Sequence, residues 1–338
     1  NVSEGERFLW YSTTGWMMWN YALGALLCGA TLCIYEGSLS YPSLGTIWRY
    51  AEEINLDHFG AGAAFYIACA KRGVQVPNLG LKTLGSTGSP LPAETFVYLQ
   101  NALPETQLIS LSGGTDVCSA FLTGCPWLPV YAGEIQCTAL GAAIEAWSDE
   151  GKAVLGEVGE LVITKPMPSM PVYFWNDEGN VRYQESYFEK YPGVWCHGDW
   201  IKFTDNEGVI IYGRSDATLN RGGVRIGTAE IYTAIDDLVA DSLVVCVDAK
   251  DGSSEMRLFV QVEGKLTLKL ERDIKSRLKS RYTPRHVPDR IIQVPEIPYT
   301  LSGKKLELPV KKLLMGYSLE QSVSRDAVRN PEALDFWL

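Results

Sequence analysis

The sequence has few of the residues from which metal centres are built. Its 338 residues include three histidines and eight cysteines, and no two cysteines are spaced as C-x-x-C. A zinc site would therefore have few ligands to recruit. Cysteines scattered in this way are typical of a cytoplasmic protein whose thiols stay reduced and mostly buried. They are Cys28, Cys33, Cys69, Cys118, Cys125, Cys137, Cys196 and Cys246.

Basic residues are also scarce. The chain has 30 Lys and Arg against 40 Asp and Glu, so its formal net charge is -10. A protein that neutralises phosphates along a nucleic acid usually has a basic excess, so no nucleic acid partner is expected. With 46% hydrophobic residues, 32 glycines and 17 prolines, the composition excludes collagen-like, disordered and coiled-coil proteins.

One long stretch lacks charged residues altogether. It covers residues 8–35 and is long enough to span a bilayer. However, it contains Ser12, Asn20 and Gly29 among other polar residues and glycines, and it ends in a β-rich run. We therefore expect a buried helix around residues 17–27 that leads into a buried strand at 30–35, and no membrane span. No secretory signal with a basic first segment opens the chain.

Length and composition together predict two domains. A chain of 338 residues corresponds to about two domains of roughly 150 residues. Residues 1–220 hold 11 basic and 23 acidic residues, whereas residues 221–338 hold 19 and 17. Nine of the ten tryptophans also precede residue 216. We expect one domain over residues 1–215 and a second over residues 216–338.

Hydrophobic patterns place an α/β arrangement first and an α+β arrangement second. In the first part, helices at 46–54 and 93–101 alternate with strands at 59–61 and 107–111. Short β-like runs at 143–147, 159–164 and 208–212 indicate a small β-subdomain. Beyond residue 216, the pattern predicts a helix at 228–238, strands at 242–247 and 257–262, and a basic helix at 268–280.

The most informative stretch is residues 213–232, GRSDATLNRGGVRIGTAEIY. It contains a turn rich in glycine between two arginines, followed by Thr228 as a candidate helix N-cap. A hairpin and linker with solvated charges is the plainer interpretation. The stretch resembles the Gly-Arg-x-Asp, Gly-x-Arg-Ile and Glu-Ile signature of adenylate-forming enzymes, which include acyl-CoA synthetases, adenylation domains and luciferases.

This resemblance implies roles for several residues of the stretch. Arg214 and Asn220 would bind the nucleotide, and Arg225 would be catalytic. Asp216 would be the hinge before a mobile C-terminal lid domain, residues 216–338. Gly223 would lie in the turn that admits the pantetheine arm of coenzyme A. Residues 1–215 would be the C-terminal portion of the adenylation domain.

A second motif, residues 112–117 (SGGTDV), follows a predicted strand. By resemblance it is the nucleotide-site loop, in which Gly114 and Thr115 contact the nucleotide, Thr115 at the α-phosphate, and Asp116 helps to hold Mg²⁺. A hydroxyl can donate to a phosphoryl oxygen, and a hard cation needs a carboxylate. The family usually has a glutamate where Asp116 stands, and aspartate has a shorter reach. The plainer interpretation is a glycine-rich turn capped by an aspartate.

Two further motifs occur in the family's order. Residues 195–199 (WCHGD) resemble the motif whose carboxylate, here Asp199, accepts hydrogen bonds from both ribose hydroxyls. Residues 297–305 (IPYTLSGKK) resemble the signature that carries the catalytic lysine, here Lys304. A lysine on a loop supplies a point charge as negative charge develops on the carboxylate and α-phosphate. We expect the neighbouring Lys305 to be exposed.

Within the family, the resemblance over essentially the whole chain is to the branch that joins acetoacetate to coenzyme A. It rests on residues 11–20, 84–91, 129–136, 174–177 and 285–288. Relatives specific for acetate have a tryptophan where this chain has Gly113, so a longer acid would fit. The implied acyl pocket and adenine segment consist of Trp16, Met17, Thr87 and Gly113, and of Gly88, Ser89 and Pro90. An aromatic and methionine stripe is also common in plain cores.

One family motif is missing. The Ser/Thr/Gly-rich loop that ends in Gly-x-x-Lys and holds the β- and γ-phosphates should precede residues 13–16 (TTGW). Residues 11–15 (YSTTG) are not followed by a lysine at the required spacing. The sequence therefore predicts that the chain begins inside the adenylation domain and that its partner is the missing N-terminal segment of the same enzyme.

The resulting hypothesis is an ATP-dependent acid:CoA ligase that uses ATP, Mg²⁺ and coenzyme A to activate acetoacetate through an acyl-adenylate. One alternative is an adenylation domain that loads another acid onto a carrier protein. Such a domain usually has an aspartate for an amino group near residues 11–27, where this chain has none. Another is an inactive nucleotide-binding fragment, which the missing phosphate loop favours and the retention of Asp199, Arg214, Arg225 and Lys304 opposes.

Overall fold

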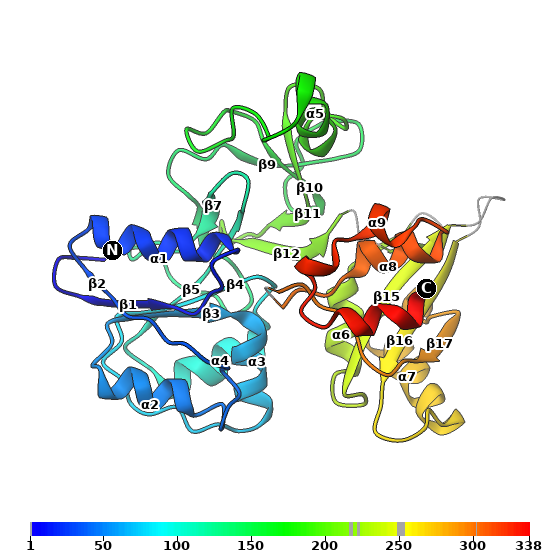
Figure 1. The fold of residues 1–338 in the computed structure, drawn as a ribbon, viewed down its shortest axis with the longest axis horizontal. Coiled ribbons are helices and arrows are strands. Elements are labelled where there is room, and N and C mark those ends of the chain that lie inside the picture. The colour runs from blue at the N-terminus through cyan, green and yellow to red at the C-terminus, as the bar shows by residue number, and fades with distance from the viewer. Residues whose placement is uncertain (1, 216–218, 222–223, 249–253, 302) are drawn as a thin grey trace. The chain divides into compact units, whose positions relative to one another are not determined.

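The computed structural model describes residues 2–215, 219–221, 224–248, 254–301 and 303–338; for residues 220, 221, 224, 225, 248 and 254 it describes the backbone. The chain forms two compact units, residues 1–211 and residues 212–338. Figure 1 labels most of the helices and strands of both units.

The first unit is built on a five-stranded parallel sheet. Its strand order is β2 (Thr31–Leu32), β1 (Arg7–Trp10), β3 (His58–Gly62), β4 (Thr83–Thr87) and β5 (Gln107–Ser110). Helix α1 (Met17–Leu27) covers one face, and α2 (Thr46–Glu53), α3 (Ala63–Lys71) and α4 (Ala93–Ala102) cover the other (Figure 1). The alternation of helices and parallel strands confirms the predicted α/β class.

Both faces of this sheet carry a hydrophobic core. The face under α2, α3 and α4 buries Trp48, Phe59 and Tyr66 completely or nearly so. The face under α1 buries Phe8 and Trp10. The indole of Trp10 lies over Gly60 and Gly85, which pair across β3 and β4, and a Cβ atom at Gly85 would be 2.5 Å from that ring. Glycine at both positions is what makes room for the indole.

The uncharged segment differs from its prediction. Helix α1 has the predicted bounds, but its outer side is exposed, and Leu27 is 92% exposed. The expected buried strand at 30–35 is a two-residue edge strand, because only Thr31 and Leu32 pair with β1. None of the helices in the described part of the chain has the length and apolar character to cross a membrane.

Two antiparallel sheets complete the first unit. One contains β6 (Ser112–Gly114), β7 (Ser119–Thr123) and β8 (Cys137–Thr138). The other has the order β12 (Val209–Arg214), β11 (Trp195–Phe203), β10 (Gly159–Ile163) and β9 (Ile144–Trp147). The last three residues of β12 belong to the second unit. The two sheets share a core with α5 (Val181–Tyr187), which follows the short η1 (Glu178–Asn180). This is the predicted β-subdomain.

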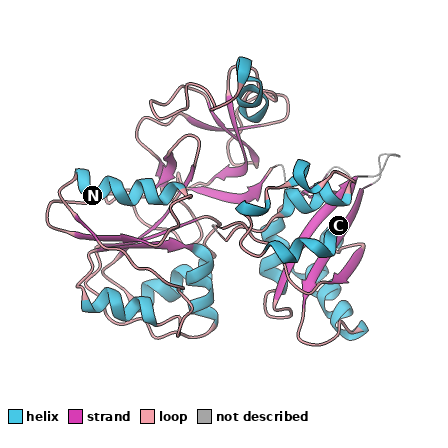
Figure 2. Ribbon diagram, viewed as in Figure 1, coloured by secondary structure: helices cyan, strands magenta, loops and turns pink. Residues whose placement is uncertain are grey.

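The second unit is an α+β arrangement, as predicted. A hairpin of β13 (Leu219–Arg221) and β14 (Val224–Ile226) precedes a sheet in the order β15 (Asp241–Asp248), β16 (Ser254–Gln261) and β17 (Arg290–Gln293). Helices α6 (Thr228–Ile235) and α7 (Leu268–Arg281) pack on one face. Helix α8 (Glu307–Leu314) and η4 (Pro331–Trp337) pack on the other (Figure 2). The short segment η2 (Pro284–His286) follows α7 in the sequence, and α9 (Leu319–Ser322) and η3 (Arg325–Ala327) lie between α8 and η4.

Two local predictions are wrong. Thr228 is not the N-cap of α6; Gly227 is, and Thr228 is the first, buried residue of the helix. The Glu230 carboxylate accepts the Gly227 N–H at 3.4 Å, so an acidic residue in the first turn supplies the cap. The cysteines are not mostly buried either: all eight are free thiols, but only Cys69 and Cys246 are buried, and Cys28 and Cys118 are exposed.

Candidate functional site

The carboxyl ends of the parallel strands bring several predicted residues to one edge. Strands β1, β4 and β5 run in the same direction, so the segments that follow them, residues 11–16, 88–92 and 111–118, leave the sheet on the same side. In open α/β sheets, ligands bind at this edge. Trp16, the candidate adenine residues and the glycine-rich turn with Gly113 belong to these segments, and Met17 and Thr87 are directly adjacent to them.

The end of β4 is tied to the end of β5. The Thr87 hydroxyl donates to the carbonyl oxygen of Leu111 at 2.8 Å. Gly88, at a φ of 90°, turns the chain beside Trp16, and a Cβ atom there would be 3.5 Å from the indole. Trp16 and Met17 are half-buried against the core under α1. Thr87, Gly88 and Trp16 are therefore close together, as an acyl pocket would require.

Ser89 and Pro90, the rest of the predicted adenine segment, are exposed directly after Gly88. Strand β4 ends at Thr87, and α4 begins at Ala93. Both side chains therefore lie on the surface at the carboxyl edge. This position is accessible to a planar ligand, and the adenine role stays a prediction.

Gly113 and Gly114 occupy tightly packed positions. A Cβ atom at Gly113 would overlap the carbonyl oxygen of Ser119 and lie 2.9 Å from Cα of Ala120, its partner in β7. A Cβ atom at Gly114 would be 2.8 Å from Cε1 of His197. A side chain at position 113 therefore meets the backbone of β7 first. Whether Gly113 also borders an acyl pocket stays a prediction.

Thr115 and Asp116 are exposed in the turn that follows these glycines. The turn is closed by a hydrogen bond from the Cys118 N–H to the carbonyl oxygen of Thr115 at 3.1 Å. Oδ2 of Asp116 accepts the hydroxyl of Tyr187, the last residue of α5. Thus the predicted phosphate-contacting hydroxyl and the predicted metal-binding carboxylate are neighbours on the surface.

Three aromatic side chains connect Asp116 with Asp199. The Tyr187 ring stacks on Trp195 with ring centroids 3.6 Å apart. The Trp195 indole N–H donates to Nδ1 of His197 at 3.3 Å, and Nε2 of His197 lies 3.6 Å from Oδ2 of Asp199. If His197 is neutral, Nδ1 as acceptor leaves the proton on Nε2, which faces Asp199. We call Tyr187, Trp195 and His197 the aromatic path.

The aromatic path places two carboxylates in one connected array. The Asp199 side chain is 12% exposed and follows Gly198, which has a φ of 84° within β11. Asp116 is exposed at the other end. The Asp199 carboxylate can accept hydrogen bonds from hydroxyl groups, and the Asp116 carboxylate is accessible to a cation. Within the described ranges, no three His, Cys, Asp or Glu side chains come together in a way that could hold a metal ion by themselves.

Cys196, which lies between Trp195 and His197 of the aromatic path, has an unreactive thiol. Burial, and secondarily the nearby Glu160 carboxylate, raise the pKa of its thiol to about 12. The thiolate is the nucleophilic form of cysteine, so this thiol has little nucleophilic character at neutral pH. The array therefore consists of hydrogen-bonding and charged groups without a cysteine nucleophile at this position.

In the second unit, the signature stretch is described in part. Gly213 has a φ of 120°, and Arg214 is exposed at the end of β12. Asn220 and Arg225 are register partners in the β13–β14 hairpin. Asp216 and Gly223, the predicted hinge and the predicted coenzyme A turn, lie outside the described residues. The hairpin thus brings two of the five predicted residues, Asn220 and Arg225, opposite each other.

The two neighbouring lysines have different surroundings. Lys304 is exposed, and its backbone N–H donates to Oγ1 of Thr300 at 3.0 Å. The prediction that Lys305 is exposed is wrong: its side chain is 20% exposed, and its Nζ donates to Oδ1 of Asp241 at 2.7 Å. Only Lys304 of this pair presents its side chain at the surface, as the predicted catalytic role requires.

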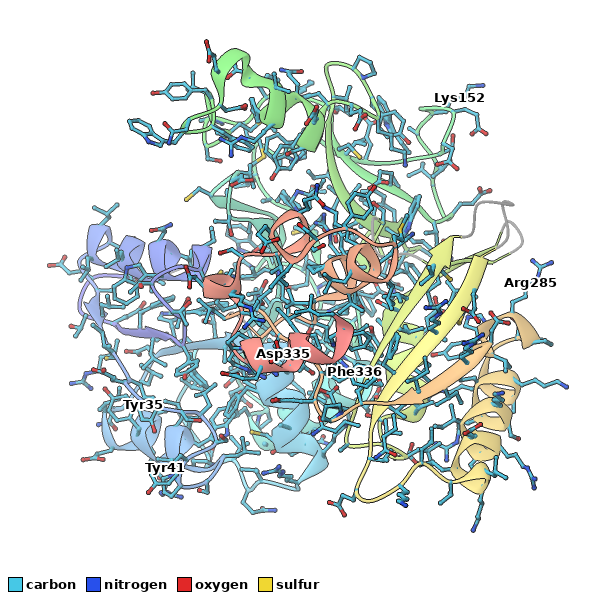
Figure 3. All side chains as sticks on the ribbon, turned by 45° about the vertical axis from the view of Figure 1, so that its right-hand side comes forward. Tyr35, Tyr41, Lys152, Arg285, Asp335 and Phe336 are labelled. Carbon is cyan, nitrogen blue, oxygen red and sulfur yellow. The ribbon has the colours of Figure 1, made fainter. Side chains whose placement is uncertain are left out.

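Arg285 belongs to another of the stretches on which the resemblance rests. It lies on η2, is exposed, and points away from the body of the second unit (Figure 3). The next residue, His286, is buried, with Nε2 2.9 Å from Oε2 of Glu230. One part of this stretch therefore supports the cap of α6, and the other faces solvent.

Sequence reasoning missed most of the residues that connect the site. Trp195 and His197 lie in the motif that pointed to Asp199, and a period of two along a strand places these two on one face. That alternation could have identified them. Tyr187 and Asp241 have no comparable local signal, because their partners are distant in sequence.

Comparisons with known proteins identify similar chains. The model of the family described as AMP-binding enzyme matches residues 1–174. The acetoacetyl-coenzyme A synthetase of Rhizobium meliloti (strain 1021) is 45% identical over 345 residues, a match that covers 99% of this chain and 52% of that protein. The acetoacetyl-CoA synthetase of Gallus gallus is 41% identical, over 100% of this chain and 52% of that protein. The chain thus spans about half the length of these curated relatives.

Solved structures agree with these matches. The acetoacetyl-CoA synthetase from Streptomyces lividans superimposes with a TM-score of 0.90 at 44% identity, covering 99% of this chain and 53% of that chain. The anthranilate CoA ligase AuaEII in complex with anthranoyl-AMP gives a TM-score of 0.75 at 18% identity, covering 95% of this chain and 61% of that chain. The second similarity shows the fold alone.

Proposed function

The chain belongs to the family of AMP-binding enzymes, and from this premise we propose that it is the C-terminal half of an ATP-dependent acid:CoA ligase acting on acetoacetate. One observation carries the proposal. Proteins named acetoacetyl-CoA synthetase match this chain at 44–45% identity over 99% of its length. The residues at the carboxyl edge of the parallel sheet support the proposal, because their side chains suit the binding of a nucleotide and a small acid.

The proposed reaction has two steps. First, a carboxylate oxygen of the acid bonds to the α-phosphorus of ATP, and the bond to pyrophosphate breaks. Next, the thiol of coenzyme A loses its proton and attacks the acyl carbon, and AMP leaves. A thioester, AMP and pyrophosphate are the products.

In the first unit, the site residues would bind and orient the nucleotide. Thr115 is exposed beside Asp116 and would donate its hydroxyl to an α-phosphate oxygen. Asp199 would accept the ribose hydroxyls, with His197 at 3.6 Å holding its orientation. The exposed Asp116 fits a role beside the Mg²⁺ of Mg-ATP, since this ion is commonly bound by one carboxylate together with phosphate oxygens. The ion would neutralise phosphate charge there.

The second unit would act as the lid that supplies positive charge. Lys304, exposed on its turn, would stabilise the charge that develops on the carboxylate and α-phosphate during adenylation. Arg214 and Arg225 would add further positive charge near the nucleotide. Residues 216–338 would move between the two steps, with Asp216 as the hinge and Gly223 beside the pantetheine arm.

ATP–pyrophosphate exchange tests the proposal. We expect no acetoacetate-dependent exchange by the 338-residue chain alone, because donors around the β- and γ-phosphates would come from a preceding segment. A protein extended upstream through that segment should catalyse exchange and then form acetoacetyl-CoA when coenzyme A is added. Strong exchange by the 338-residue chain would contradict the half-enzyme proposal. Exchange by the extended protein with amino or aryl acids, but not with acetoacetate, would contradict the proposed substrate.

A further inference from the structure

The turn that carries Lys304 is anchored on both sides by one carboxylate. Tyr299 precedes the turn, and its hydroxyl donates to Oδ2 of Asp241 at 2.6 Å. Lys305 follows the turn, and its Nζ donates to Oδ1 of Asp241 at 2.7 Å. Tyr299 and Lys305 also face each other as an antiparallel bridge. Asp241, the first residue of β15, therefore joins the two ends of the turn to the sheet.

A second set of contacts surrounds Lys305. Its Nζ also donates to the carbonyl oxygen of Ser242 and lies 4.1 Å from the centroid of the Tyr232 ring. The Tyr232 hydroxyl in turn donates to Oε1 of Glu307 at 2.6 Å, at the start of α8. Hydrogen-bonded carboxylate and carbonyl oxygens and an aromatic face thus hold the ammonium group in one position.

Hydrogen bonds between Thr300 and Lys304 connect Lys304 to the anchored ends of the turn. The Thr300 N–H donates to the carbonyl oxygen of Lys304 at 2.8 Å, and the Lys304 N–H donates to Oγ1 of Thr300 at 3.0 Å. Ser302, within the turn, lies outside the described residues. The Lys305 side chain points toward the sheet, where it binds Asp241, whereas the Lys304 side chain is exposed.

We propose that Asp241 and Lys305 are positioning residues that set the location of Lys304 for the adenylation step. The inference rests on the proposed function for the role of Lys304, and on the contacts above for the anchor itself. A charge that is already in place when the transition state forms needs no reorganisation at that moment. A lysine on a loosened turn would sample many positions and stabilise the transition state less.

Four variants distinguish the effect of losing the charges of the anchor from a general loss of stability. Lys305→Met keeps the aliphatic stem over Tyr232 and removes the ammonium group, whereas Lys305→Arg keeps a cation. Asp241→Asn keeps the size of the side chain and removes its charge. Lys269→Met is the matched control, because Lys269 is an exposed lysine on α7 of the same unit.

Amide hydrogen exchange in the 338-residue chain tests the anchor without any enzymatic activity. We expect the Thr300 and Lys304 amides to exchange about tenfold faster in Lys305→Met and Asp241→Asn, because their hydrogen bonds depend on the anchored turn. Amides of the β15–β16 ladder should keep their rates in all variants, which shows that the unit stays folded. Unchanged exchange at Thr300 and Lys304 in both variants would overturn the anchor.

Separate half-reactions in the extended protein test the positioning role. In Lys305→Met, kcat for ATP–pyrophosphate exchange should fall at least about tenfold with little change in the KM for ATP, and Lys305→Arg should recover most of the loss. Conversion of supplied acyl-adenylate to thioester should stay unchanged. Equal loss of both half-reactions would show a merely structural role. An inactive parent protein would instead refute the proposed function. The amide hydrogen exchange rates would still show whether Asp241 and Lys305 anchor the turn.

Discussion

The hydroxyl of Tyr187 donates to the carboxylate of Asp116, although 71 positions separate the two residues. The bond joins the end of α5 to the turn that follows β6. Trp195 stacks on the Tyr187 ring and continues the contact toward Asp199. The predicted phosphate turn therefore depends on the β-subdomain for its conformation and not only on its own glycines.

Tyr187→Phe should lower the stability of the turn and weaken nucleotide binding. The ring can keep its stack on Trp195, so the change isolates one hydrogen bond to a carboxylate. We expect a loss of about 1 kcal/mol in the free energy of unfolding of the 338-residue chain, measured in urea. In the extended protein, the KM for Mg-ATP should rise more than kcat falls. Tyr131→Phe, at an exposed tyrosine, is the control, and equal effects of the two changes would refute the assignment.

Gly113→Ala should destabilise the chain because its Cβ atom would overlap the carbonyl oxygen of Ser119. Relief requires β6 and β7 to separate, which should cost about 1–3 kcal/mol in the free energy of unfolding. Gly24→Ala in α1 is the matched control, since a Cβ atom there meets nothing within 4 Å. That change should be neutral or stabilise by up to about 1 kcal/mol. Chemical denaturation checks both, and equal stabilities would contradict the close packing.

Lys304→Ala should separate the two half-reactions of the extended protein. If the ammonium group stabilises only the adenylation transition state, ATP–pyrophosphate exchange should fall about 10²–10³-fold. Thioester formation from supplied acetoacetyl-adenylate and coenzyme A should be spared. Parallel loss in both assays would be incompatible with the role assigned to Lys304. Lys269→Met again serves as the control.

Glu6 should make the stability of the first unit sensitive to acid. Hydrogen bonds from Lys82 and then from His58 lower the pKa of Glu6 from 4.5 to about 2. The folded chain thus favours the ionised carboxylate. Its contribution is fully present above pH 4.5 and is lost as the pH falls toward 2. The full shift would correspond to about 3 kcal/mol. Because the Lys82 side chain is 54% exposed, solvent screening should reduce the contribution at neutral pH to about 1–2 kcal/mol.

Urea unfolding of Glu6→Gln at several pH values tests this expectation. The variant should be less stable than the parent at pH 7, and the difference should shrink as the pH is lowered below about 4.5. Glu4→Gln, at an exposed glutamate two positions earlier, is the control and should change little. A difference between Glu6→Gln and the parent that stays constant down to pH 3 would argue against the depressed pKa.

Thiol labelling should divide the cysteines into two groups. Cys28 and Cys118 are exposed, so they should react quickly with a disulfide reagent in the folded chain. Burial raises the pKa of Cys69 to about 11 and that of Cys196 to about 12, so these two should react slowly until the chain unfolds. Mass spectrometry of labelled peptides identifies the order. Fast labelling of Cys69 or Cys196 under native conditions would contradict the structure.

The class of the fold and the bounds of several elements could be predicted from the amino-acid sequence alone. Helix α1 covers the predicted residues 17–27, and α7 differs from its prediction by one residue at its end. These patterns are local, because the spacing of apolar side chains along a helix or strand reflects which side is covered. The motifs around Thr115, Asp199 and Lys304 were also visible locally, since each is a short run of consecutive residues.

Which of these residues contact one another could not be predicted from the sequence, because the contacts form between elements that are distant along the chain. The exposure of Leu27 and the shortness of β2 depend on what packs outside the sheet, which no local pattern records. The sequence predicts that both Lys304 and Lys305 are exposed, yet Asp241, more than 60 positions earlier, binds Lys305 and leaves Lys304 at the surface. Partners so distant in the sequence meet only when the strands and helices have packed, and the energy of a charged side chain depends on that environment.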